Sequence, residues 1–190
     1  MKKNLLMVLI LVPCLLSAQH RLTHADSLAM LKNKHKELRQ RYALDSVAIS
    51  KVLPQRPHNL VNDYTHTLSD RDKRSLENKL DALDAAKMAQ LAIVIVPSVG
   101  KYDAMEYGFG LAQTWGIGQK RKNNGVLILV AINDHKAAIL TGLGLENFIT
   151  DAVCDKIIQN SLFPHFKNGD FFGGLDEGTY QLITLIKAHR

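Results

Sequence analysis

This sequence has few cysteines, the residues that stabilise small secreted scaffolds, and its histidines, which often bind zinc, are scattered. Only 2 of its 190 residues are cysteines, Cys14 and Cys154, which excludes a disulfide-rich scaffold. The eight histidines do not occur at the spacing of zinc ligands. Cys154 shares one face of an expected helix with Ile157 and Ile158. We therefore interpret it as a buried small hydrophobic residue rather than a catalytic thiol.

Motifs for nucleotide binding and for serine-hydrolase catalysis are also missing. No glycine pair completes a dinucleotide fingerprint after the first strand, and none forms a phosphate loop with a lysine. No serine lies on a glycine-flanked turn between a strand and a helix, so an esterase triad has no local support. The glycines are instead expected at turns and at points of close packing. The pairs are Gly108/Gly110, Gly116/Gly118 and Gly142/Gly144.

Residues 1–19 have the pattern of a secretory signal peptide. Two lysines precede an apolar run of about 12 residues, which is shorter than the roughly 20 needed to span a bilayer. Cleavage is expected after Ala18 or Gln19. Acylation of Cys14 is the alternative, although Pro13 directly before it fits a lipoprotein signal poorly. The protein is therefore expected to be exported, to the periplasm or the cell exterior, with no transmembrane helix in the mature chain.

The positive charge lies mostly before the expected globular domain. The formal net charge is +6, but residues 20–58 hold eight Lys or Arg against three acidic residues, whereas 59–190 hold 14 against 15. A nearly neutral domain argues against nucleic acid as a partner. An amphipathic basic helix is predicted over 26–52, ending before a linker at Pro54 and Pro57. We expect it to pack on the domain or on a partner protein. Contact with an anionic membrane surface is the alternative.

From residue 59 to residue 190 the pattern is that of one α/β domain. Two continuous apolar, β-branched runs predict strands that are covered on both faces. A shorter strand precedes them, and a tight turn leads into a fourth. Helical patterns alternate with the strands, so we predict a three-layer α/β/α sandwich whose mostly parallel sheet has an antiparallel hairpin edge. The expected strands are 60–63, 91–96, 125–132 and 137–141, and the expected helix caps are Ser69, Asp103, Thr150 (for a helix to about 161) and Asp170.

Carboxylates follow the predicted parallel strands at their carboxyl ends, where ligands of α/β sheets gather. Asp63 ends the first strand, Asp103 follows the second, and Asp134 lies in the hairpin turn. Their oxygens suit hard cations such as Ca²⁺ or Mg²⁺. Asp103 also suits a helix cap and Asp134 a turn, whereas Ser69 leaves Asp63 no capping role. Asp63 is therefore the first candidate for a metal ligand.

An ordered series of short motifs resembles the TPM domain family, which includes thylakoid-lumen phosphatase and photosystem-repair proteins and many exported bacterial proteins. The resemblance covers roughly residues 54–187. No single motif is specific, but the ordered set is. The motifs are Leu-Val-Asn-Asp at 60–63, Leu-Ser at 68–69, Trp-Gly-Ile-Gly at 115–118, Asn-Asn-Gly at 123–125, Gly-Leu-Gly-Leu-Glu at 142–146 and Pro-His-Phe-Lys-Asn-Gly-Asp at 164–170.

The resemblance implies an α/β/α fold, divalent-metal binding at an acidic site and, in some members, phosphatase activity. Asp63 matches the acidic residue of the family's Val-x-Asp motif, and Asn124 matches the Asn-Gly before the central strand. Asp151 matches the acidic residue after the Gly-x-Gly segment. Asn123 stands where similar proteins often have Asp, which removes a charge from this region. The predicted metal ligands are Asp63, Asp103, Asn124 and Asp151.

Two functions stay open from the sequence. One is a non-catalytic metal-binding or interaction module that maintains envelope proteins. The other is a metal-dependent phosphatase acting on phosphomonoesters, in which a metal held by Asp63 and a second carboxylate polarises a phosphoryl oxygen. The first is favoured because no clear nucleophile or general acid accompanies the carboxylates. The location is open too: Asn124 begins a strand and Asp63 ends one, so they meet only if the loop at 116–124 folds across the sheet.

Overall fold

The protein is built around one four-stranded sheet. A computed structural model describes residues 33, 37, 52–119 and 121–189, so the predicted signal peptide and nearly all of the predicted 26–52 helix lie outside the described residues. The strand order is β1-β2-β3-β4, with β1, β2 and β3 parallel and β4 antiparallel to β3. This confirms the predicted sheet with its antiparallel hairpin edge. The strands are β1 (Val61–Asp63), β2 (Gln90–Val96), β3 (Gly125–Ala131) and β4 (Lys136–Thr141).

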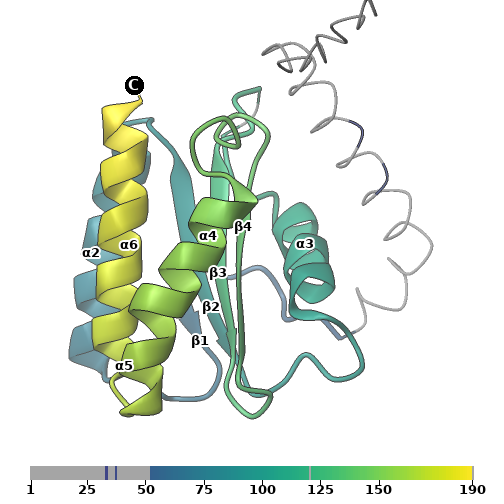
Figure 1. The fold of residues 1–190 in the computed structure, drawn as a ribbon, viewed down its shortest axis with the longest axis vertical. Coiled ribbons are helices and arrows are strands. Elements are labelled where there is room, and N and C mark those ends of the chain that lie inside the picture. The colour runs from purple at the N-terminus through teal and green to yellow at the C-terminus, as the bar shows by residue number, and fades with distance from the viewer. Residues whose placement is uncertain (1–32, 34–36, 38–51, 120, 190) are drawn as a thin grey trace, which may run out of the picture.

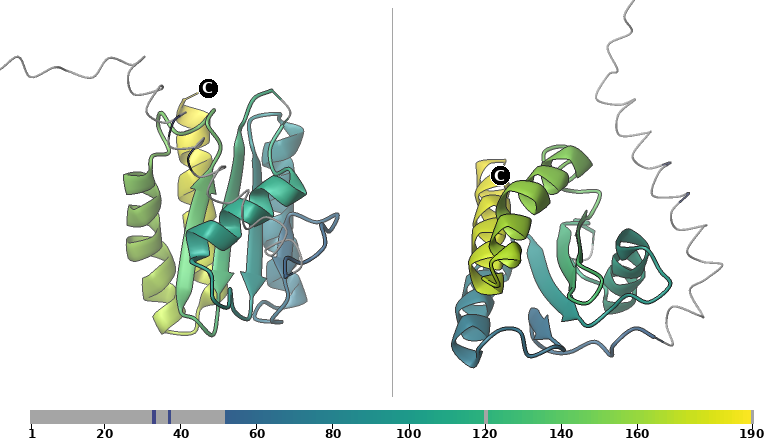
Figure 2. Two further views of the ribbon diagram at one scale, coloured as in Figure 1. Left: turned by 90° about the vertical axis from the view of Figure 1, so that its right-hand side faces the viewer. Right: turned by 60° about the horizontal axis from the view of Figure 1, so that its bottom comes forward.

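The sheet is the middle of three layers, as predicted (Figure 1). Successive side chains of a strand point to opposite faces. In β2, Leu91 and Ile93 therefore join one core cluster, whereas Ala92 and Val94 join the other. Among the helices described over 52–119 and 121–189, Figure 2 shows α3 alone on one face and the others on the opposite face. The first face is covered by α3 (Ala104–Trp115), and the second by α2 (Asp70–Ala85), α4 (Asp151–Ile157), the π-helix η1 (Ile158–Leu162), α5 (Phe163–Lys167) and α6 (Phe171–Ala188).

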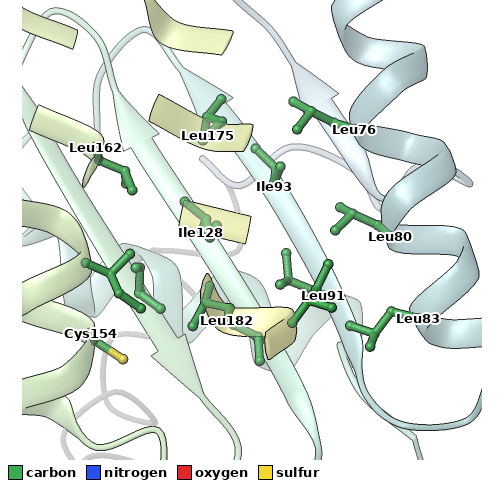
Figure 3. Close-up of a cluster of buried hydrophobic side chains, with 14 of the residues drawn as sticks. Leu76, Leu80, Leu83, Leu91, Ile93, Ile128, Cys154, Leu162, Leu175 and Leu182 are labelled. Carbon is green, nitrogen blue, oxygen red and sulfur yellow. The ribbon is translucent and has the colours of Figure 1, made fainter. Parts of the chain in front are cut away.

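The larger core cluster lies between the sheet and the helices of the second face. Figure 3 shows Leu76 and Leu80 of α2 on one side of this core and Leu175 of α6 beside them, over the β2 side chain of Ile93. All four side chains are fully buried. Each burial of this size contributes about 1.5–3 kcal/mol, so this cluster is the main source of the domain's stability.

All four predicted helix caps are confirmed. Ser69, Thr150 and Asp170 each accept a hydrogen bond from a backbone N–H in the first turn of the following helix. Asp103 forms the reciprocal box with Glu106. The helix that begins after Thr150 differs from its prediction, because it widens into η1 after Ile157 instead of continuing as an α-helix. None of the helices described at 52–119 and 121–189 combines the length and apolar composition that a bilayer crossing requires.

The two parallel crossovers have opposite hands. Both step in the same direction along the sheet, from β1 to β2 and from β2 to β3, yet α2 and α3 lie on opposite faces. One of them is therefore left-handed, which is rare for such connections. As a result, the chain leaves the carboxyl ends of β1 and β2 toward different faces, which is the arrangement that opens a ligand crevice in α/β sheets. Asp63 is the last residue of β1 and lies at this point.

Candidate functional site

The predicted metal ligands divide between the two ends of the sheet. We call the end where β1, β2 and β3 finish the carboxyl end, which is the lower end in Figure 1, and the opposite end the amino end. Asp63 and Asp103 follow β1 and β2 at the carboxyl end. Asn124 precedes β3, and Asp151 opens α4 after the chain has left β4, so both lie at the amino end. The four residues do not form one ligand set, and a cation site built on Asp63 stays a prediction.

The carboxylate of Asp63 holds the loop that follows β1. Its Oδ1 accepts hydrogen bonds from the backbone N–H of Thr65 at 2.9 Å and from the Thr65 hydroxyl at 2.7 Å. Its Oδ2 accepts from the backbone N–H of Leu68 at 2.7 Å. Asp63 caps no helix, but it does have a structural role, because it fixes the loop from Thr65 to Leu68. Each carboxylate oxygen has two lone pairs, so Oδ2 keeps one acceptor position for a ligand.

The other carboxylates at this end serve their own segments. Asp103 accepts from the backbone N–H of Met105 at 2.8 Å, and is the cap that the sequence predicts. Asp134 accepts from the Ser98 hydroxyl and the Val99 backbone N–H, both at 2.8 Å, and these two bonds hold its pKa below the usual value, the Val99 bond most. Across the described residues, no three His, Cys, Asp or Glu side chains gather closely enough to hold a metal ion.

Two tyrosines at the carboxyl end, Tyr64 and Tyr107, have a raised pKa. Partial burial raises the pKa of Tyr64, and burial raises the pKa of Tyr107, with a smaller contribution from the charge of ionised Tyr64. Both phenols therefore stay protonated near neutral pH. Tyr64 is 42% exposed and is one of the few large exposed side chains of the domain. Neutral phenols are hydrogen-bonding groups here, and not bases.

At the amino end, Asn124 is a structural residue. Its side chain is 4% exposed, and its Oδ1 accepts from the backbone N–H of Gln119 at 2.9 Å. Its Nδ2 donates to the Met88 carbonyl at 2.8 Å and to Gln119 Oε1 at 3.3 Å. The backbone N–H of Gly118 also donates to Gln90 Oε1 at 2.9 Å. These bonds keep the glycine-bounded loop at the amino end, so it does not fold across the sheet to bring Asn124 to Asp63.

Glycines let two loops of the amino end interlock. A Cβ added at Gly142 would collide with the carbonyl oxygen of Asn123, and one at Gly144 would collide with the carbonyl oxygen of Lys122. Both obstacles are backbone atoms, which cannot move aside as a flexible side chain does. The prediction that this glycine pair serves close packing is confirmed.

A polar network that the sequence does not predict joins η1, α5 and α6. His165 lies between two carboxylates, with Nδ1 at 2.7 Å from Asp170 Oδ2 and Nε2 at 3.2 Å from Glu177 Oε2. Hydrogen bonding to Asp170 is the main cause that raises the pKa of His165. The pKa of Asp170 is lowered, first by the backbone N–H of Gly173 and then by His165. The only sequence signal was the short spacing of His165 and Asp170 across the end of one helix and the start of the next.

This network is not a hydrolase triad. The Ser161 hydroxyl is 1% exposed and donates to Glu177 Oε1 at 3.1 Å. It also accepts from Gln181 Nε2 at 2.7 Å. In a triad the serine hydroxyl is exposed to substrate and bonded to the histidine. Here it is buried and bonded to a carboxylate and an amide, so its role is to fasten the helices together.

Cys154 is inert in this setting, as the sequence predicts. Its side chain is 4% exposed, and Figure 3 shows it at the margin of the larger core cluster. Burial is the main cause that raises the pKa of its thiol to about 12, with smaller contributions from Asp151 and Asp155. A thiol with so high a pKa carries almost no thiolate at neutral pH and is a poor nucleophile.

Comparisons with known proteins agree with this fold. The TPM domain family model matches residues 61–185. The N-terminal domain of a protein from P. gingivalis is 28% identical, with a TM-score of 0.64 over 69% of this chain and 83% of that one. The N-terminal domain of cg2496 from Corynebacterium glutamicum is 21% identical, with a TM-score of 0.52 over 66% and 78%. BA42 from Bizionia argentinensis is 19% identical, with a TM-score of 0.52 over 65% and 84%. No curated protein matches. With the family model covering more than half of its length, the chain belongs to the TPM domain family.

Proposed function

We propose that this protein is an exported, non-catalytic TPM module that binds Ca²⁺ or Mg²⁺ at Asp63 and takes part in the maintenance of envelope proteins. The observation that carries the cation site is the position of the Asp63 carboxylate. It lies where the connections of β1 and β2 diverge to opposite faces, and its Oδ2 accepts a single hydrogen bond. Export rests on the sequence pattern of residues 1–19.

The donors around Asp63 suit a hard cation. They are oxygens throughout: the carboxylate itself and the hydroxyls of Thr65 and Thr67, which lie 2.6 Å apart. Asp63 is the one carboxylate of this loop, so most positions around a bound ion would be filled by water. Such a site belongs at the weak end of protein calcium sites, with a dissociation constant on the order of 10⁻⁴–10⁻³ M.

A metal-dependent phosphatase is the second candidate, and one observation favours it. The Thr65 hydroxyl donates to the Asp63 carboxylate at 2.7 Å, which is the arrangement of a nucleophile beside a base. The same hydroxyl lies 2.6 Å from the Thr67 hydroxyl, and Asp63 already accepts two backbone bonds. These hydrogen bonds fit a role in fixing the loop better than a role in catalysis. We therefore favour the non-catalytic, cation-binding module.

Thermal melting of the full chain in Ca²⁺, Mg²⁺ or EDTA tests the cation site. Asp63→Asn removes the ligand charge, and Asp134→Asn is the matched control, because Asp134 ties a loop at the same end in the same way. A cation at ten times its dissociation constant adds about 1.4 kcal/mol, or a rise of roughly 3–6 °C. We expect this rise in the wild type and in Asp134→Asn, and none in Asp63→Asn. Equal melting of the wild type in Ca²⁺ and EDTA would sink the proposal.

Hydrolysis of p-nitrophenyl phosphate separates the two candidates. The assay uses the wild type, Asp63→Asn and Thr65→Val at a saturating concentration of each cation. A module gives the same background rate for all three proteins. Cation-dependent turnover that disappears in both variants would establish the phosphatase and overturn the non-catalytic role.

A further inference from the structure

A cavity of about 470 Å³ opens at the carboxyl end, between the β3–β4 hairpin and α5. The end of β3 forms its floor, Phe163, Phe166 and Phe171 form one wall, and Lys136 and Lys167 line it together with His135. Its volume is within the roughly 300–1,000 Å³ of small-molecule sites. The cavity borders β3 and β4, whereas Asp63 ends β1 at the far edge of the sheet. It is therefore separate from the proposed cation site.

The wall of the cavity is a continuous aromatic surface. The rings of Phe163 and Phe166 meet edge to face with centroids 6.5 Å apart, and Phe166 and Phe171 are tilted with centroids 4.9 Å apart. All three side chains are partly buried against the larger core cluster. The bonds from His165 to Asp170 and Glu177 hold α5 on α6, so this wall is formed before any ligand arrives. The phenylalanine wall therefore provides a preformed surface on which the apolar part of a ligand can pack.

The charge of the lining is positive and is not neutralised by ion pairs within the described part of the chain. Lys136, Lys167 and His135 are exposed, and neither lysine has a carboxylate within ion-pair distance among the described residues. The two acidic residues nearest in sequence form no ion pair with these lysines and accept hydrogen bonds from other groups, although the charges of Lys136 and His135 also help to lower the pKa of Asp134. Asp134 accepts from Ser98 and Val99, and Asp170 accepts from Gly173 and is paired with His165.

We infer that this cavity binds a medium-chain fatty acid, with its acyl chain on the phenylalanine wall and its carboxylate at Lys136 and Lys167. A fatty acid has one anionic end and no other polar group. The cavity matches this, because the side chains that line it are apolar apart from the two lysines and His135. A peptide in the same place would bring backbone N–H groups for which these side chains provide no acceptor. The positive charge of the lysines and the apolar wall together favour a ligand with an acyl chain and one carboxylate.

Titration of the ¹⁵N-labelled full chain with decanoate, kept below its micelle concentration, tests this site. Decyltrimethylammonium is the matched probe, because it has the same chain length and the opposite charge. We expect saturable amide shifts confined to 130–136 and 163–171 for decanoate, and binding at least tenfold weaker for the cationic probe. Equal affinity for the two probes, no saturation with decanoate, or shifts centred elsewhere would each overturn the proposal.

The double variant Lys136→Gln/Lys167→Gln tests the carboxylate contact. Both side chains are exposed, so the fold should survive, and a thermal melt verifies it. We expect decanoate to bind at least tenfold more weakly. The control is Lys87→Gln/Lys187→Gln, which removes the same charge from exposed positions at the amino end and should leave the affinity unchanged. Unchanged affinity in the first variant, or an equal loss in both, would contradict the proposal.

Discussion

The two ends of the sheet are built from different chemistry. At the carboxyl end, exposed or partly buried carboxylates each tie down one segment: Asp63 the loop after β1, Asp134 the loop after β2, and Asp170 the start of α6. At the amino end, the Asp84 carboxylate accepts from the side-chain amides of Gln90 and Gln119, and uncharged groups add further contacts. The buried amide of Asn124 and the backbone contacts at Gly142 hold the loops there. The carboxyl end is thus held mainly by carboxylates that water also reaches, whereas the amino end adds a buried amide and close backbone packing to its one carboxylate.

Ionisation follows the same division. Among the described residues, the groups with a shifted pKa lie at the carboxyl end, apart from the buried thiol of Cys154. Both proposed sites, for a cation and for an acyl carboxylate, lie at the end where these shifted groups are found. The shifted groups there are Tyr64, Asp70, Tyr107, Asp134, His165 and Asp170.

The largest effect should come from breaking the amino end with Gly142→Ala. The new methyl group would collide with the carbonyl oxygen of Asn123, so two loops must separate. We expect a loss of about 3 kcal/mol in the free energy of unfolding, measured by urea denaturation. The control is Gly100→Ala, because Gly100 has a φ of +63° but nothing within 4 Å of the added Cβ, and its strain costs about 1 kcal/mol. Equal losses would show that the loops do not interlock.

The losses in the free energy of unfolding caused by Asn124→Ala and by Asp134→Ala compare the two ends directly. Removing the Asn124 amide leaves the Met88 carbonyl and the Gln119 backbone N–H without their partner at a partly buried position, at a cost of about 2 kcal/mol. Asp134 is bonded at the surface, where water replaces it, so its loss should be clearly smaller. Urea denaturation at one pH measures both. A larger loss for Asp134→Ala would reverse the comparison.

The same Asn124 variant sharpens the assignment of the cation site. The Asn124 amide oxygen already accepts from Gln119 and lies at the opposite end from Asp63. We therefore expect Asn124→Ala, although less stable, to show the same melting rise in Ca²⁺ as the wild type. Loss of that rise would mean that the amino end holds the ion.

Much of the fold follows from local sequence signals. The apolar runs around Ile93 and Ile128 predict strands because a strand covered on both faces needs apolar residues at every position. The caps at Asp103 and Thr150 are equally local, since a capping side chain reaches only two or three residues along its own helix. The buried state of Cys154 follows from its place on the apolar face of α4.

The site depends on paths of the chain that local signals do not fix. Asp63 bonds Leu68 only because the loop between them turns back on itself, and Asn124 bonds Met88 from 36 residues away. The opposite hands of the crossovers follow no residue pattern. The phenylalanine wall is similar: Phe163 and Phe166 have the spacing of an ordinary core-facing helix stripe. They line a cavity because α5 lies beside the β3–β4 hairpin.

The smallest effect is the pH dependence of the His165 contacts. Folding raises the pKa of His165, chiefly through its bond to Asp170, so the protonated ring is favoured in the folded state. Its stabilising contribution is therefore fully present below the unfolded pKa of about 6.5 and is lost as the pH rises through the folded pKa. The exposed position screens the interaction, so the effect is small.

His165→Gln should thus destabilise the protein more at about pH 5.5 than at about pH 8.5, as measured by urea denaturation at both values. Asp170→Asn is the informative companion, because it keeps the histidine and removes the partner that contributes most to the shift. In that background, the additional effect of His165→Gln should depend less on pH. If the loss caused by His165→Gln is the same at both pH values in the wild type, the charge of this histidine does not stabilise the carboxyl end. The contrast between the two ends would then rest on packing alone.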